Sequence, residues 1–218
     1  MKTTLDPPWL VADLGAPHRV ASWALNRPGL TTARRIVWRE VRNADLPVDL
    51  DAGAWFGREL DGAGHAEAIG FLTSRSVARF TRARVEVEDA VAEAVATVGL
   101  SNAERVGSRQ ARPAFVGTIN IAIAATQALS DGALLEAINI AAEARTAAVM
   151  THGPELAGLP ATGTGTDCIA VAAPLTGTPA AHAGKHTAIG EAIGRAVLDA
   201  VSRGVQDWMN EKKGGRHG

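Results

Sequence analysis

The chain has 218 residues, of which 46% are hydrophobic and 21% are charged. That length can fill one core and is short for two, so a single domain over residues 1–218 is expected. The formal net charge is −1 and no long basic run occurs, which argues against a nucleic-acid partner. No apolar run approaches the ~20 residues that span a bilayer, so no membrane partner is expected.

The single cysteine, Cys168, cannot form an intramolecular disulfide, and the opening MKTTLDPPWL lacks the apolar stretch of a signal peptide. We therefore expect a cytoplasmic protein. Cys168 has no cysteine-protease motif around it and is interpreted as a small core residue. Residues 1–20 carry three prolines and residues 211–218 are polar and glycine-rich, so both ends are expected to be loosely ordered.

The first half of the chain gives short, mixed signals. β-Branched and aromatic residues alternate with arginines over residues 32–41, which predicts a strand, and residues 50–60 are expected to form a short helix. Residues 69–73 are predicted to form a buried strand, followed by a helical turn that ends near Phe80. Residues 88–98 combine alanines typical of a helix with valines typical of a strand, and we favour a strand.

The second half gives clearer periodicity. Isoleucines at every second position over residues 119–123 share one face and small residues share the other, which indicates a central strand. Residues 131–150 carry apolar residues at helical spacing, residues 166–173 repeat the strand pattern, and residues 187–208 form a long amphipathic helix. Strands interleaved with helices predict an α/β fold, a layered single domain in which helices pack on a mixed β-sheet.

The most unusual stretch is ATGTGTDC, residues 161–168, in which glycines alternate with threonines before a strand. Glycine lets a backbone approach a ligand closely, and threonine hydroxyls add donors and acceptors. A carboxylate at the start of a buried strand must be paired, capped or functional. The alternative is a tight turn whose threonines satisfy neighbouring backbone groups. The candidate site residues of this turn are Gly163, Thr164, Gly165, Thr166 and Asp167.

A second segment, residues 182–191, places His182, Lys185 and His186 just before the long C-terminal helix. Lys185 is the only lysine away from the chain ends, and a compact ammonium can stabilise an oxyanion. A neutral histidine can accept a proton from water, so either histidine is a candidate general base. Their spacing of four also fits zinc ligands on a helix, but an N-cap at Thr187 would place them on a loop. Bracing the start of the helix is the alternative role.

Polar residues inside apolar segments form a third group. Thr118 and Asn120 belong to the predicted central strand, where a buried asparagine needs hydrogen-bond partners. Glu143 and Arg145 lie in the helix that follows, and Arg145 interrupts its apolar stripe and needs a carboxylate. Arg145 with Glu143 or Asp167 forms either a structural ion pair or the rim of a binding site.

Three segments, in this order and at this spacing, resemble the adenosylcobinamide amidohydrolase (CbiZ) family: GTINIAIAATQALSDGALLEAINIAAEARTAAV, ATGTGTDCIAVA and AGKHTAIGEAIGRAV. The resemblance covers roughly Ser22–Val205. It implies hydrolysis of the amide that joins aminopropanol to adenosylcobinamide, which releases adenosylcobyric acid for cobamide salvage. The corrinoid is then the substrate and no cofactor is expected, while a homo-oligomer remains possible. The matching positions are Thr118, Ile119, Asn120, Glu143, Ala144, Arg145, Thr164, Thr166, Asp167 and Gly184–Thr187.

For that reaction we expect a water to attack the amide carbonyl, with His186 or Asp167 as general base. Lys185 and the backbone amides of the GTGT turn would stabilise the oxyanion. This mechanism requires the turn and the His-Lys-His loop to meet around one cavity. Hydrolysis assisted by a metal on His182 and His186 is an alternative.

A covalent alternative uses Thr118 or Thr164 as the nucleophile, because each follows a glycine as in self-cleaving amidohydrolases. A corrinoid-binding or carrier protein without catalysis is the alternative outside enzymes, since similarity along a chain does not guarantee retained chemistry. The chain contains no tyrosine, so Trp38 and Trp55 are the candidates for stacking on the corrinoid.

Overall fold

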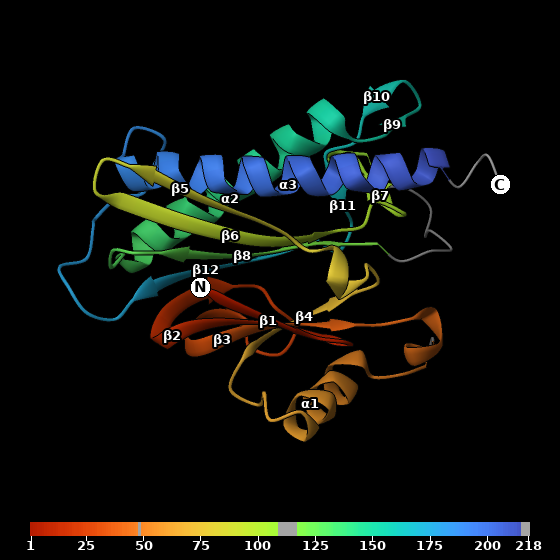
Figure 1. Cartoon of the computed structure of the whole chain (residues 1–218), viewed down its shortest axis with the longest axis horizontal. Coiled ribbons are helices and arrows are strands. Elements are labelled where there is room, and N and C mark those ends of the chain that lie inside the picture. The colour runs from red at the N-terminus through yellow and green to blue at the C-terminus, as the bar shows by residue number, and fades with distance from the viewer. Residues whose placement is uncertain (48, 109–116, 215–218) are drawn as a thin grey trace.

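The computed structural model describes residues 1–47, 49–108 and 117–214. Over these residues the chain forms four layers, in the order helices, strands, strands, helix (Figure 1). The expected α/β architecture, with helices packed on a mixed sheet, is confirmed. Helices α2 and α3 cover one outer face and α1 covers the other (Figure 1). Their bounds are Ala52–Gly62 for α1, Asp131–His152 for α2 and Ala188–Gly214 for α3.

One eight-stranded sheet supplies both inner layers, in the order β4-β3-β2-β12-β8-β6-β5, with β1 paired to β2. β12 is parallel to β8 and β4 is parallel to β3, whereas the other neighbouring pairs in this sheet are antiparallel. The strands of this sheet are β1 (Lys2–Asp6), β2 (Trp9–Ser22), β3 (Gly29–Glu40), β4 (Ile69–Thr73), β5 (Thr81–Val87), β6 (Ala90–Val98), β8 (Ile119–Ala125) and β12 (Cys168–Pro174).

Short elements connect these strands. The two-residue strands β7 and β11 pair with each other, as do β9 and β10. The short elements are the 3-10 helices η1 (Asn43–Asp45) and η2 (Val77–Arg79) and the strands β7 (Ala103–Glu104), β9 (Glu155–Leu156), β10 (Leu159–Pro160) and β11 (Gly163–Thr164).

Two hydrophobic clusters form the core around β8, one on each face of the strand. Ile119, Ile121 and Ile123 are fully buried in the cluster that includes residues of α2 and α3, while Ala122 faces the cluster between the two strand layers. The predicted alternation over this strand is confirmed. Each buried isoleucine contributes roughly 1.5–3 kcal/mol to folding, and the small residues opposite let the second strand layer pack closely.

The N-terminal segment differs from the sequence expectation. The prediction of loosely ordered first residues is wrong, because β1 and β2 are strands and β2 lies inside the sheet. Pro17 lies where the pairing of β2 with β3 shifts register, between Asp13 and His18, and Gly15 there has φ 83°. A bulge tolerates a residue without an amide hydrogen, so this proline interrupts the sequence pattern without ending the strand.

The C-terminal end is also more regular than expected. α3 continues through residues 211–214, which the sequence analysis assigned to a loose tail, and residues 215–218 lie outside the described part. Glu211 accepts hydrogen bonds from both terminal nitrogens of Arg75, at 2.5 and 2.8 Å. This ion pair attaches the last turns of the helix to the connection between β4 and β5.

The start of α3 matches the sequence analysis. The Gly190 amide donates to the Thr187 hydroxyl at 3.0 Å, so Thr187 caps the helix as predicted. A side chain at Gly190 would bring its Cβ within 2.5 Å of the Ala183 carbonyl oxygen, so the backbone of α3 lies close against the preceding loop here. Over the three described ranges, no helix has both the length and the apolar character needed to cross a membrane.

Candidate functional site

A pocket of about 440 Å³ opens at the amino ends of the parallel strands β8 and β12, and we call it the strand-end pocket. Its walls are mostly apolar and its floor carries threonine hydroxyls and an asparagine amide. By walls we mean the apolar lining residues, which include Trp23, Leu25, Leu46 and Phe71, and by floor the polar lining residues Thr118, Asn120 and Thr166.

Thr118 occupies the floor, one residue before β8, and is 5% exposed. Its hydroxyl lies 2.8 Å from the Thr166 carbonyl oxygen and 3.1 Å from Asn120 Oδ1, and its single proton serves one of them at a time. The Thr166 hydroxyl donates to the Gly117 carbonyl at 2.8 Å, and Asn120 Nδ2 donates to the Leu72 carbonyl at 2.8 Å. The polar groups of the floor are therefore held in fixed positions.

Asp167 braces this corner of the fold. Its Oδ1 accepts from the Ile119 amide at 2.9 Å and from the Thr164 hydroxyl at 2.5 Å. Its Oδ2 accepts from the Thr164 amide at 2.9 Å and pairs with the Arg145 guanidinium. A carboxylate has about four acceptor sites, so these bonds leave none for a water. The arrangement favours the structural ion pair among the two roles considered for Arg145.

Gly163 of the turn is required by this packing. A Cβ at Gly163 would lie 2.5 Å from Asp167 Oδ2, and a Cβ at Gly165 would lie 2.9 Å from Glu104 Oε1. Gly165 also lines the strand-end pocket, whereas Gly163 and Thr164 line a different hollow next to Arg145. Glycine is therefore needed at position 163, where Asp167 is fixed by its hydrogen bonds, whereas at position 165 the Glu104 side chain can move aside.

The His-Lys-His loop does not meet the turn, so the hypothesis of one shared cavity is wrong. The turn leads into the amino end of β12, and the loop follows its carboxyl end, where Ala180 pairs with Leu129. The seven residues of β12 separate them by about 20 Å. In Figure 1, α3 starts at the left end of the molecule and β11 lies right of centre. His186 and Lys185 therefore do not line the strand-end pocket.

The loop residues instead contact helix α2. Lys185 pairs with Glu143, and His182 Nδ1 lies 3.7 Å from Glu136 Oε1. The hydrogen bond from Lys185 is the main cause that lowers the pKa of Glu143. Glu143 does not pair with Arg145, because residues two apart face different sides of a helix. These contacts favour the bracing role of the loop.

No metal centre is visible among the described residues. In the three described ranges, no group of three or more His, Cys, Asp or Glu side chains could hold a metal ion together. His182 and His186 are both exposed, and His182 is near one carboxylate.

Cys168 lines the strand-end pocket. Its Sγ lies 3.9 Å from the Ser22 hydroxyl, and burial raises the pKa of the Cys168 thiol to about 12. A thiol with this pKa is protonated near neutral pH and is a weak nucleophile. Cys168 is therefore a half-buried residue in the lining of the pocket. Its nearest polar neighbours do not make the thiol a nucleophile.

The exposed aromatic of the pocket is Trp23, which the sequence analysis did not select. This residue is 45% exposed, and its Nε1 donates to the Asp167 carbonyl at 2.8 Å. The two predicted stacking residues lie elsewhere: Trp38 is fully buried against Phe71, and Trp55, on α1, packs beside Arg39. Trp23 directly follows the end of β2, and an aromatic residue at such a position is a candidate for ligand contact. The sequence analysis missed it because it did not predict β2.

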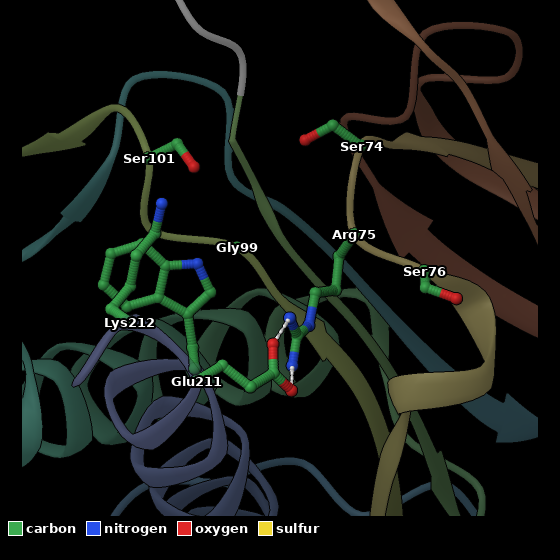
Figure 2. A pocket seen from close by; sticks show the side chains of 8 residues that line it. Ser74, Arg75, Ser76, Gly99, Ser101, Glu211 and Lys212 are labelled. Atoms are coloured by element: carbon green, nitrogen blue, oxygen red, sulfur yellow. Dashed lines mark hydrogen bonds and ion pairs between the residues drawn. The ribbon is translucent and has the colours of Figure 1, made fainter. Parts of the chain in front are cut away.

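A further hollow, of about 610 Å³, is lined by residues that include Arg75, Ser101 and Glu211 (Figure 2). Ser74 lines both hollows, and the amide of Gly99, which lines the second, donates to the Thr118 carbonyl at 2.9 Å. Figure 2 shows Arg75 and Glu211 paired across this hollow. The hydrogen bond from Arg75 is the main cause that lowers the pKa of Glu211.

The family match spans nearly the whole chain. The profile described as adenosylcobinamide amidohydrolase matches residues 1–213. The chain belongs to the adenosylcobinamide amidohydrolase family. An adenosylcobinamide amidohydrolase of Halobacterium salinarum is 35% identical over 113 residues, which are 49% of this chain and 46% of that protein. An uncharacterised protein of Methanocaldococcus jannaschii is 40% identical over 92 residues, 39% of this chain and 34% of that protein. The chain thus matches less than half the length of these curated relatives.

Solved structures show more distant similarity. A β-aminopeptidase of a Burkholderia species is 15% identical, with a TM-score of 0.47, over 96% of this chain and 79% of that chain. A protein of Pyrococcus horikoshii is 11% identical, with a TM-score of 0.45, over 97% of this chain and 81% of that chain.

The positions that match the adenosylcobinamide amidohydrolase family separate into two groups in space. Thr118, Asn120, Thr166 and Asp167 meet at the strand-end pocket, with Arg145 and Thr164 behind them. Lys185 and His186 lie in the loop that follows the carboxyl end of β12, where Lys185 pairs with Glu143 of α2. The first group adjoins an apolar pocket, and the second is exposed on the surface.

Proposed function

We propose that the strand-end pocket hydrolyses the amide between aminopropanol and adenosylcobinamide, releasing adenosylcobyric acid for cobamide salvage. The observation that carries this proposal is the convergence of Thr118, Asn120 and Thr166 on the floor of one mostly apolar pocket. Ligand sites commonly combine apolar walls with a few fixed polar groups. Membership of the family supports the reaction class. The reaction is expected in the cytoplasm, where a free thiol such as Cys168 stays reduced.

The size of the pocket determines how a corrinoid would bind. A volume of about 440 Å³ admits one arm of the molecule, and the macrocycle itself is much larger. We therefore place the amide arm in the pocket and the ring outside it. Trp23 and Leu25 are 45% and 54% exposed at the pocket and offer an apolar surface to the ring.

Thr118 is the nucleophile that the geometry favours. Asp167 has no free acceptor site, Cys168 is protonated, and Thr164 lines a different hollow. In the proposed reaction, Thr118 Oγ1 attacks the amide carbonyl carbon, the carbon–nitrogen bond breaks, and aminopropanol leaves after its nitrogen has taken the Thr118 hydroxyl proton. Water then hydrolyses the Thr118 ester and releases the carboxylate. Each turnover consumes one water.

The test compares the wild-type chain with Thr118→Ala and uses Thr126→Val as the matched control. Thr126 follows the other end of β8 and its hydroxyl bonds to the Val91 backbone, so its loss leaves the pocket intact. Each protein is incubated with adenosylcobinamide, and the products are identified by mass. We expect adenosylcobyric acid and aminopropanol from the wild type and the control, and ~10²-fold or slower release from Thr118→Ala.

Two outcomes would contradict the proposal. Turnover by Thr118→Ala at the wild-type rate would remove Thr118 from the nucleophile role. Tight binding of adenosylcobinamide by the wild type without any product would favour the corrinoid-binding or carrier protein instead.

A further inference from the structure

The strand-end pocket contains a nucleophile but lacks a base among the described residues. Its ionisable side chains are Asp167 and Cys168. The acceptor sites of Asp167 are filled by the Ile119 and Thr164 groups and by Arg145. No histidine or lysine of the described ranges lines the pocket. A hydroxyl nucleophile needs a group that takes its proton, so the chain must provide one in another way.

The Gly117–Thr118 peptide bond beside this nucleophile is unusually constrained. Its carbonyl oxygen, on Gly117, accepts a hydrogen bond from the Thr166 hydroxyl at 2.8 Å. A Cβ on Gly117 would lie 2.5 Å from Asn102 Oδ1 and 2.9 Å from the Gly99 carbonyl oxygen, so the backbone is tightly enclosed. Thr118 Oγ1 can reach the Gly117 carbonyl carbon through a five-membered ring. A donor thus polarises the carbonyl that the adjacent hydroxyl can attack.

We propose that the chain cleaves its own Gly117–Thr118 bond and that the new α-amine of Thr118 is the general base for amide hydrolysis. The cleavage follows from the geometry alone, and the role of the amine rests on the proposed function.

The chemistry balances with one water. Thr118 Oγ1 attacks the Gly117 carbonyl carbon, and the Thr166 hydroxyl stabilises the resulting oxyanion. The carbon–nitrogen bond then breaks, the Thr118 nitrogen takes the hydroxyl proton, and an ester joins Gly117 to Thr118 Oγ1. Water hydrolyses this ester, which leaves a carboxylate on Gly117 and a free hydroxyl and a free amine on Thr118.

Cleavage before Thr118 would give the strand-end pocket the general base and the oxyanion donor that the intact chain lacks. An α-amine has a pKa of about 7.7–8.0, so much of it is neutral and able to accept a proton near pH 8. Departure of the Gly117 carbonyl would free the Thr166 hydroxyl to donate to the substrate oxyanion. Asn102 is 7% exposed, and its Oδ1 has no hydrogen-bond partner among the described residues. This acceptor faces Gly117 and is available to the new amine.

Denaturing intact-mass measurement and N-terminal sequencing of the purified chain test the cleavage. We expect two fragments, residues 1–117 and residues 118–218, the second beginning with Thr-Ile-Asn-Ile. Thr118→Ala should stay whole, and Thr118→Ser should be cleaved because it keeps the hydroxyl. Thr166→Val should cleave at least ~10-fold more slowly, because it lacks the donor to the Gly117 carbonyl. Thr126→Val, just past the other end of β8, should match the wild type.

Hydroxylamine provides a chemical check, since it attacks esters faster than amides. We expect it to accelerate cleavage of the slow Thr166→Val chain and to leave a hydroxamate on Gly117. A melting curve of Thr118→Ser shows that this variant is folded, so its cleavage reports on the hydroxyl alone.

The outcomes separate this inference from the proposed function. A wild-type chain that stays whole while it hydrolyses adenosylcobinamide would overturn self-cleavage and leave the function standing. A chain cleaved before Thr118 that never turns over the corrinoid would support self-cleavage and overturn the function. Cleavage before Thr164, or cleavage of Thr118→Ala, would also overturn the inference.

Discussion

The role of Asp167 could be predicted from the sequence only in part. The sequence analysis left open whether a carboxylate at this strand start is paired, capped or functional, and the structure shows it in contact with Arg145 and Thr164. Whether Asp167 acts as a general base or as a structural brace depends on how many acceptor sites of its carboxylate are filled. The groups that fill them lie on three segments far apart along the chain, one of which supplies the Ile119 amide. A local sequence pattern does not show that these segments meet.

Removal of this carboxylate should destabilise the fold. The Asp167 side chain is 6% exposed and that of Arg145 is 16% exposed, so Asp167→Asn leaves a mostly buried guanidinium without its partner. We expect the free energy of unfolding in urea to fall by roughly 3–5 kcal/mol. Glu143→Gln, which breaks the exposed pair with Lys185, is the control and should change stability little. Equal stability of both variants would show that Asp167 does not brace this corner.

The Cys168 thiol should be almost inert in the folded chain. Burial raises its pKa to about 12, so its thiolate fraction at pH 8 is ~10³-fold below that of a free cysteine. Labelling by iodoacetamide should be slow at pH 8, accelerate about tenfold per pH unit toward pH 12, and become fast on unfolding. Rapid labelling of folded protein at pH 8 would mean that the thiol is activated and would reopen Cys168 as a nucleophile.

At the scale of elements, most strands and helices from residue 69 onward could be predicted. The strands at 69–73 and 119–125 and helix α2 follow period-two or helical apolar patterns that the core then uses. β2 was missed because a bulge carrying Pro17 interrupts its alternation. β5 was missed although its buried positions alternate with charged ones, so its signal was present in the sequence.

Two helical glycines should respond in opposite directions to alanine. At Gly190 a Cβ would lie 2.5 Å from the Ala183 carbonyl oxygen, so Gly190→Ala must displace backbone and should lower the melting temperature. At Gly57, inside α1, nothing lies within 4 Å, so alanine should stabilise by about 0.5–1 kcal/mol through helix propensity. Calorimetry of both variants checks this. A Gly190→Ala chain as stable as the wild type would contradict the close packing of α3 on the loop.

At the scale of the whole molecule, the candidate site depends on where the Thr/Gly turn and the His-Lys-His loop lie relative to each other. The sequence analysis selected a turn whose residues line the strand-end pocket, and it expected this turn to meet the loop that follows the next strand. A strand, a helix and a second strand joined in sequence normally place the two strands parallel. The start of β12 then lies beside the start of β8, and the loop after β12 lies at the opposite end. Applied to residues 119–174, this rule by itself places the loop and the turn at opposite ends of the second strand.

The attachment of the α3 end to the sheet should depend on pH. The hydrogen bond from Arg75 lowers the pKa of Glu211 from its ordinary value of 4.5, so this pair stabilises the fold above pH 4.5. The contribution is lost as the pH falls through the lowered pKa. We expect Glu211→Gln to melt below the wild type at pH 7 and the difference to disappear in acid. A difference that persists in acid would show that the charge of Glu211 is not its cause.

The central claim is that the chemistry takes place at the amino ends of β8 and β12 and not at the His-Lys-His loop. The most direct test is the kcat for adenosylcobinamide hydrolysis by His186→Ala and by Lys185→Ala. Both side chains are exposed at the far end of β12, so we predict rates within about threefold of the wild type. A loss of ~10²-fold or more in either variant, with its fold intact, would contradict the account and move the active site to the loop.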